Sequence, residues 1–155
     1  MRIGLLVSAN LLPGADGRRE DHFEFDEQLA SLRPAFAKVG MSVDPVLWDR
    51  ADEQADAYDA LLPLMVWDYF EGNEARFLSV MERAAARTTV LNPPALLRWN
   101  SDKAYLEEME RRGAKTLPTR RVDQVSEADA DAAFERFGTD RIVIKPQVGG
   151  GAWRQ

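Results

Sequence analysis

A chain of 155 residues, 45% hydrophobic and 30% charged, is long enough to bury one core without disulfides or a structural metal. Its formal net charge of −6 argues against a general nucleic-acid binder or a protein that binds anionic membranes, because both roles need a basic surface. The lack of cysteine and the single histidine, His22, exclude disulfide frameworks, thiolate zinc sites, cysteine nucleophiles and multi-histidine metal sites.

The sequence carries no signal typical of membrane insertion or export. Its longest apolar run, residues 60–67, contains Pro63 and is far shorter than the roughly 20 residues that span a bilayer. The opening residues 1–7 are too few for the core of a signal peptide. We therefore expect a cytoplasmic protein without nucleic-acid or membrane partners, and the sequence leaves a homo-oligomer open.

The first 40 residues have the pattern of a strand, a long loop and a helix. Residues 3–7 are an apolar run typical of a strand buried on both faces of a parallel sheet. The polar connection that follows, residues 10–24, exceeds the usual length of such loops and is a candidate binding loop. Apolar residues then recur at helical spacing from Phe25 to Val39, which predicts an amphipathic helix that contains Pro34.

Three more strands and one more helix are predicted before residue 92. The strands are expected at residues 41–48, 60–66 and 88–91, and the helix after Asn73, a favourable N-cap residue. Strands that alternate with helices indicate an α/β fold with a Rossmann-like parallel sheet. We expect this domain to cover residues 1–95, which end at a double proline.

Residues 96–155 have a different pattern and are predicted to begin a second, incomplete subdomain. A polar stretch, residues 98–103, is expected to open a helix at Ser101, so that Lys103 lies in its first turn. The remaining predicted elements are a helix over 101–112, a short strand over 116–119, a helix over 126–137 and a last strand over 142–145.

Two lysines stand where they could hold the phosphates of a nucleotide. A cation such as Lys103 in the first turn of a helix opposes the helix dipole unless an anion shares the site. Lys145 ends the predicted strand and is followed by a glycine run, whose backbone N–H groups can converge on an anion. Each feature also has an ordinary structural explanation: a solvated helix lysine, a charge at a strand end and a flexible turn.

Together these segments resemble the ATP-grasp superfamily, in particular the glutathione-synthetase-like and RimK-like carboxylate–amine ligases. The resemblance rests on Asn92-Pro93-Pro94, on residues 99–106, on Pro118-Thr119 and on residues 142–146 with the glycine loop that follows. It implies a Rossmann-like domain followed by a small subdomain with two phosphate-binding lysines and a glycine-rich loop. The implied ATP-binding residues are Lys103, Lys145, Gly149, Gly150 and Gly151.

The resemblance also implies an activity. Such ligases use ATP to convert a small-molecule carboxylate into an acyl phosphate, which an amine then attacks to form an amide-type bond. Their magnesium ligands lie beyond the matching segments, and no residue after Lys145 in this chain is acidic. We therefore assign no catalytic residue and no metal ligand here, and expect this chain by itself to bind ATP weakly and to turn nothing over.

Substrate contacts are expected in the loops after the first and third strands, because open α/β sheets bind ligands at the carboxyl ends of their strands. Arginine in such a loop could bind a carboxylate through two parallel hydrogen bonds, although a charged surface loop and aromatic packing are the ordinary explanations for these residues. The candidates are Ser8, Asn10, Arg18, Arg19, Trp67, Asp68 and Tyr69.

The main alternative is a non-catalytic Rossmann-like module that binds a small anion or a partner protein. Dinucleotide-binding domains and P-loop proteins fit less well, because neither glycine signature occurs in the chain.

Overall fold

The computed structural model describes residues 1–149 and divides the chain into two units. The first is Met1–Ser101, and the second begins at Asp102. The sequence had placed this division after residue 95. The difference is the helix α4 (Pro94–Ser101), which belongs to the first unit because it packs against α3 (Glu74–Ala85).

The first unit is built on a four-stranded parallel sheet. Its strands are β1 (Arg2–Val7), β2 (Ser42–Leu47), β3 (Ala60–Met65) and β4 (Thr89–Val90), in the order β2-β1-β3-β4. All four predicted strands are present, and the predicted α/β class is confirmed. The chain passes from β1 to one neighbour and then to the other, so the switch in strand order lies between β1 and β3.

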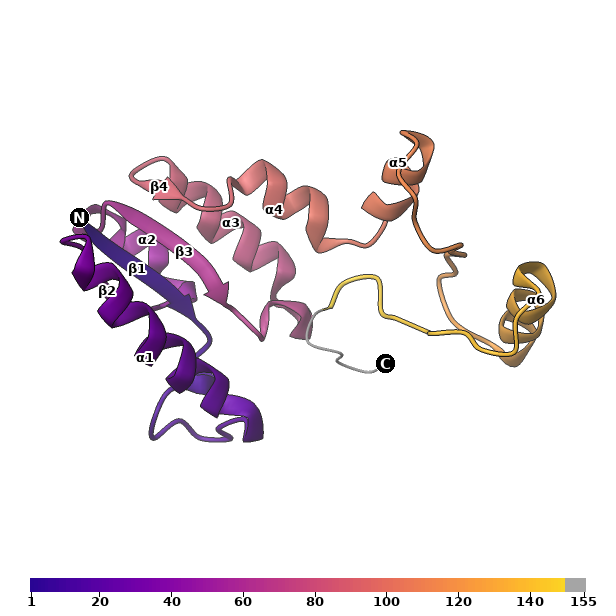
Figure 1. Ribbon diagram of the computed structural model, residues 1–155, viewed down its shortest axis with the longest axis horizontal. Helices are drawn as coiled ribbons and strands as arrows, with labels where there is room; N and C mark the ends of the chain where they lie inside the picture. The colour runs from indigo at the N-terminus through magenta and orange to yellow at the C-terminus, as the bar shows by residue number, and fades with distance from the viewer. Residues whose placement is uncertain (150–155) are drawn as a thin grey trace. The chain divides into compact units, whose positions relative to one another are not determined.

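Helices cover both faces of this sheet (Figure 1). On one face, Leu5 of β1 packs with Phe25 of α1 (Phe23–Lys38). On the other, Leu6 packs with Phe77 of α3 and with the short helix α2 (Ala51–Gln54). This alternation is the period-two pattern of a strand buried on both sides.

Two prolines lie in strands at places that tolerate them. Pro45 is in β2, an edge strand. Pro63 is in the central strand β3, where the pairing with β1 shifts by one residue between Leu5 and Val7. A proline has no N–H to give to the ladder, and an irregularity of this kind accommodates it.

One predicted helix start is confirmed without its predicted cap, and another is wrong. Asn73 directly precedes α3 as expected, but its side-chain amide donates to the carbonyl oxygen of Asp68 and does not cap the helix. The polar residues 98–101 do not open a helix; they form the last turn of α4, and α5 (Tyr105–Arg111) follows after a turn. Pro94 explains the missed helix, since proline is favoured at a first helical position.

The second unit contains α5 and α6 (Glu127–Phe137). Helix α6 has a capping box between Ser126 and Asp129 and ends at Gly138, whose φ of 60° is the left-handed conformation that glycine adopts easily. None of the described residues 102–149 is buried.

The predicted strands at residues 116–119 and 142–145 are wrong. Within the described part of this unit, pairing is limited to one antiparallel bridge, between Asp102 and Val148. Val143 is 71% exposed. An apolar run becomes a strand only where a neighbouring strand accepts its backbone hydrogen bonds, and the described residues provide none here. Over residues 1–149, no helix has the length and apolar character needed to cross a bilayer.

Candidate functional site

Ser8 joins the carboxyl ends of β1 and β3 in the first unit. It is fully buried, and its hydroxyl donates to Oδ1 of Asp68 at 2.5 Å. The Ser8 Oγ also accepts the backbone N–H of Trp67 at 2.7 Å and that of Asp68 at 3.2 Å. The structure thus brings together three residues that the sequence had selected from two separate loops.

The Asp68 carboxylate is held from two sides. The indole Nε1 of Trp48 donates to Oδ1 at 2.7 Å, beside the bond from Ser8. Oδ2 accepts no hydrogen bond from the described residues and is not buried. Two donors on one oxygen fix the direction of the other, which is not fully buried. Trp48 was not a predicted site residue, because an aromatic residue directly after an apolar strand is usually part of the hydrophobic core.

Arg19 lies over the Trp67 ring, with its guanidinium carbon 5.5 Å from the ring centroid. Its Nε and Nη2 each donate to Asp21 at 2.8 Å, and Nη1 lies 3.9 Å from Glu71. The hydrogen bond from Arg19 lowers the pKa of the Asp21 carboxyl below its ordinary value. The bidentate face of this arginine is therefore already occupied by a carboxylate of the chain itself.

The other predicted residues of these loops point elsewhere. Arg18 donates to the carbonyl oxygen of Leu11 and to Asp26 of α1, each at 3.3 Å. Tyr69 packs on Phe77, with ring centroids 5.5 Å apart, and burial together with the charge of Glu74 raises its pKa. Arg18 and Tyr69 thus have structural partners.

Asn10 lies beside Arg19, because its backbone carbonyl oxygen accepts the Arg19 N–H at 3.0 Å. Its side-chain Oδ1 is buried and has no hydrogen-bond partner among the described residues. A buried acceptor without a donor is uncommon in folded proteins and calls for a specific reason.

Lys103 lies directly before α5, in a turn in which Asp102 Oδ1 accepts the N–H of Ala104 at 2.8 Å. The predicted position in the first turn of a longer helix is therefore wrong. Its backbone N–H donates to the carbonyl oxygen of Gln147 at 2.9 Å. Its Nζ donates to the carbonyl oxygens of Gly149 at 2.9 Å and Gln147 at 3.4 Å.

The two predicted lysines interact electrostatically. Burial lowers the pKa of Lys103, and the charge of Lys145 lowers it further. A Cβ atom at Gly149 would lie only 3.0 Å from Pro146 Cγ but an ordinary 3.8 Å from Lys103 Nζ, so the glycine avoids a crowded contact with Pro146. Gly150 and Gly151, also predicted to bind the nucleotide, lie outside the described residues.

Gln147 and Arg121 extend this group, although no sequence pattern pointed to either residue. Arg121 Nη2 donates to Gln147 Oε1 at 3.0 Å, while Gln147 Nε2 donates to the carbonyl oxygen of Val122 at 3.4 Å. The group around Lys103 thus holds three cations, Lys103, Lys145 and Arg121, against the carboxylates of Asp102 and Glu107, and this excess of positive charge suits a polyphosphate. A magnesium site does not fit the same residues, because residues 1–149 contain no group of three metal-ligating side chains.

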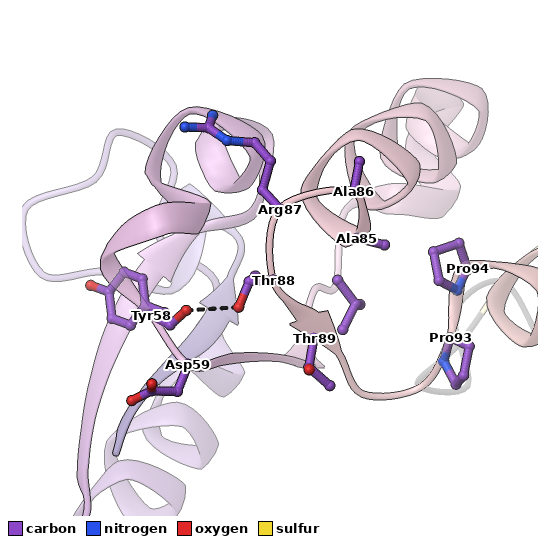
Figure 2. A pocket seen from close by; sticks show the side chains of 10 residues that line it. Tyr58, Asp59, Ala85, Ala86, Arg87, Thr88, Thr89, Pro93 and Pro94 are labelled. Atoms are coloured by element: carbon purple, nitrogen blue, oxygen red, sulfur yellow. Dashed lines mark hydrogen bonds between the residues drawn. The ribbon is translucent and has the colours of Figure 1, made fainter.

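A pocket of about 720 Å³ lies in another part of the first unit, at the starts of β3 and β4 (Figure 2). Its polar groups are largely paired: Thr88 Oγ1 donates to the carbonyl oxygen of Tyr58 at 2.7 Å, and Asp59 accepts the N–H of Arg2 at 2.6 Å. No predicted site residue lines it. We assign no function to this pocket.

Comparisons with known proteins agree on one relationship. A family model described as the N-terminal domain of D-cycloserine synthetase DcsG matches residues 3–92. The cycloserine biosynthesis protein DcsG of Streptomyces lavendulae is 28% identical over 127 residues, which are 80% of this chain and 42% of that protein. The crystal structure of D-cycloserine synthetase DcsG matches with a TM-score of 0.74 at 25% identity, over 97% of this chain and 48% of the other. The chain thus spans less than half the length of either relative.

Proposed function

Since the chain belongs to the family of the D-cycloserine synthetase N-terminal domain, we propose that it is the N-terminal part of an ATP-dependent ligase of the ATP-grasp superfamily. The relatives are named for the synthesis of cycloserine, a small molecule, so the substrates proposed here are a small carboxylate and a small amine. A biosynthetic, ligase-related role agrees with both names.

The observation that carries the ATP-binding part of this proposal is the hydrogen bond of 2.9 Å from Lys103 Nζ to the carbonyl oxygen of Gly149, in the loop that follows Lys145. Two ammonium groups from segments far apart in sequence are close enough for one to lower the pKa of the other. Such repulsion is unfavourable in the protein alone, and a bound polyphosphate relieves it. Through its bond to Gly149, Lys103 is already in contact with the loop expected to cover the phosphates.

The proposed reaction has two steps. A carboxylate oxygen attacks the γ-phosphorus of ATP, and ADP leaves, which yields an acyl phosphate. An amine nitrogen then attacks the acyl carbon, phosphate leaves and the nitrogen loses a proton. Lys103 and Lys145 would hold the phosphates and offset their charge in the first step. We derive no step through magnesium, whose ligands we expect in the remainder of a longer protein.

The non-catalytic binding module remains the second candidate. It would have a second unit with its own core, whereas no described residue between 102 and 149 is buried and residues 142–145 are unpaired. These features favour a segment that needs further protein around it. Amide hydrogen exchange separates the two: the ligase proposal expects weak protection over residues 102–149, and the module expects strong protection.

Titration of the chain with ATP tests the proposal. We expect weak, saturable binding that Lys145→Ala weakens about tenfold, the ratio that corresponds to about 1.4 kcal/mol. Lys115→Ala is the matched control, because Lys115 is an exposed lysine of the same unit for which no hydrogen bond or ion pair is assigned. Tight binding that Lys145→Ala leaves unchanged would contradict the assignment.

A further inference from the structure

The end of β1 and the end of β3 mark the switch in strand order of the sheet. Ligands of open α/β sheets bind beside such a point, outside the carboxyl ends of the strands. Ser8 follows β1, and Asp68 follows β3 by three residues, so their hydrogen bond crosses the switch point. The site proposed for substrate therefore has Asp68 at its centre.

Only one of the two Asp68 carboxylate oxygens, Oδ1, accepts hydrogen bonds from the described residues. Ser8, fully buried, and Trp48, 3% exposed, both donate to Oδ1, and the backbone carbonyl oxygen of Asp68 accepts from Asn73 at 3.0 Å. A purely structural carboxylate usually has both oxygens in use. Here Oδ2 is not fully buried and has no donor from residues 1–149.

The surroundings of Asp68 do not favour a negatively charged ligand. Arg19 is the cation beside it, and Asp21 and Glu71 already offset its charge. These three carboxylates and one guanidinium leave the site net negative. The original expectation that arginine binds a substrate carboxylate therefore does not suit Arg19 as the structure places it.

Asn10, in the loop after β1, also has a side-chain oxygen that lacks a hydrogen-bond donor. Its Oδ1 is buried without a partner among the described residues, and its backbone is bonded to Arg19. The loop after β1 and the loop after β3 thus each carry an acceptor that no described group satisfies. A ligand rich in N–H donors suits Asp68 Oδ2, and a primary ammonium group supplies three donors.

From these contacts we infer that Asp68 recognises the ammonium group of the substrate, and that this first unit selects the amine-bearing substrate by its positive charge. The inference rests on the proposed function for the idea that the site takes a substrate. It adds the chemical class, a small primary ammonium compound, and names Asp68 as the residue that determines specificity.

Titrations of the unmodified chain at pH 7, followed by NMR, test the inference. The Trp48 indole N–H is the reporter, because it donates to the carboxylate in question. The probes are glycinamide, which has an ammonium group and no carboxylate, and N-acetylglycinamide, in which the amine is uncharged. Glycinamide should shift the reporter resonance saturably, and N-acetylglycinamide and acetate should not.

The variant Asp68→Asn keeps the shape of the side chain and an oxygen for Trp48 and Ser8, but it removes the charge. It should weaken glycinamide binding by about tenfold or more. Asp59→Asn is the matched control: Asp59 directly precedes β3, at the amino end of the strand and not at its carboxyl end, and the change should leave glycinamide binding as it was. The comparison of probes needs no variant, so it decides the question even if Asp68→Asn does not fold.

Three results would overturn the inference: equal shifts with glycinamide and N-acetylglycinamide, a saturable shift with acetate alone, or unchanged glycinamide binding in Asp68→Asn. The ligase proposal is tested separately, by ATP and by Lys145 in the second unit. Loss of ATP binding with retained ammonium binding would refute the ligase and leave the ammonium site. The reverse pattern would refute the ammonium site alone.

Discussion

The ammonium group of Lys103 donates a hydrogen bond of 2.9 Å to the carbonyl oxygen of Gly149. This contact joins a residue that precedes α5 to the loop after residue 145, and it places a positive charge against backbone carbonyl oxygens. Burial and the neighbouring charge of Lys145 lower the pKa of that ammonium group. The pH dependence of nucleotide binding should therefore report on this one side chain.

ATP binding should be coupled to protonation of Lys103. A bound polyphosphate favours the charged lysine and so raises its lowered pKa. The affinity for ATP should be highest below the Lys103 pKa of the free protein. It should fall as the pH rises through that pKa toward the ordinary value of 10.5. Calorimetry in two buffers of different ionisation enthalpy, at a pH just below 10.5, should show proton uptake.

Lys103→Arg serves as the control for this coupling, because arginine stays charged over the whole range. Its ATP affinity should lose most of the pH dependence. Identical heats in both buffers for the unmodified chain would count against the coupling.

Leu61→Ala should destabilise the first unit by about 2–5 kcal/mol, since the side chain is fully buried between β3 and α3 and its removal leaves a cavity. Leu117→Ala makes the same change at a side chain that is 85% exposed, and it should alter stability by less than about 0.5 kcal/mol. Urea unfolding, followed at the Trp48 indole resonance, measures both. Similar losses from the two variants would show that the assigned core is not the stabilising one.

Ser126→Ala should weaken the start of α6, where Ser126 and Asp129 form a capping box. We expect amide exchange in the first turn of α6 to speed up about fivefold, as for the loss of a typical N-cap. The hydrogen bond from Ser126 lowers the pKa of Asp129, so this variant should also raise that pKa toward 3.8. Ser42→Ala, at an exposed serine that begins β2, should change neither quantity.

Asp21→Asn should convert Arg19 into an anion site. The change removes the carboxylate that occupies both donors of the guanidinium, and acetate should then bind where it did not before. In the unmodified chain the lowered pKa of Asp21 keeps the pair intact as pH falls through 3.8, and the pair should break only below that value. Acetate titration of both proteins at neutral pH, followed at the amide resonances of residues 19–21, would decide; no response from Asp21→Asn would be the contrary result.

Local sequence patterns predicted the first unit well, because the spacing of apolar residues along each element matches the side of that element that is buried. The apolar run of β1 is buried on both faces, and the spacing of Phe77, Val80, Met81 and Ala84 gives α3 one buried side. Helix α4 was not predicted, because the double proline was interpreted as a domain boundary. Pro94 in fact begins the helix, and Leu97 of this helix packs on the core.

Part of the candidate site could be predicted as well. Position after a strand was enough to select Ser8, Trp67 and Asp68, and the glycine run was enough to select Lys145. Charge type alone could not separate Arg18 from Arg19, because what distinguishes them is the partner each one finds in the folded chain.

The sequence by itself determined the layered α/β unit, because hydrophobic periodicity records which side of each element is buried. Only the tertiary structure decided that Asp68 presents a single oxygen and that Arg19 is already paired, since both depend on residues distant in sequence. The same reason explains the strands wrongly predicted near residues 116–119 and 142–145. An apolar run favours a strand, but it forms one only where a neighbouring strand pairs with its backbone N–H and C=O groups.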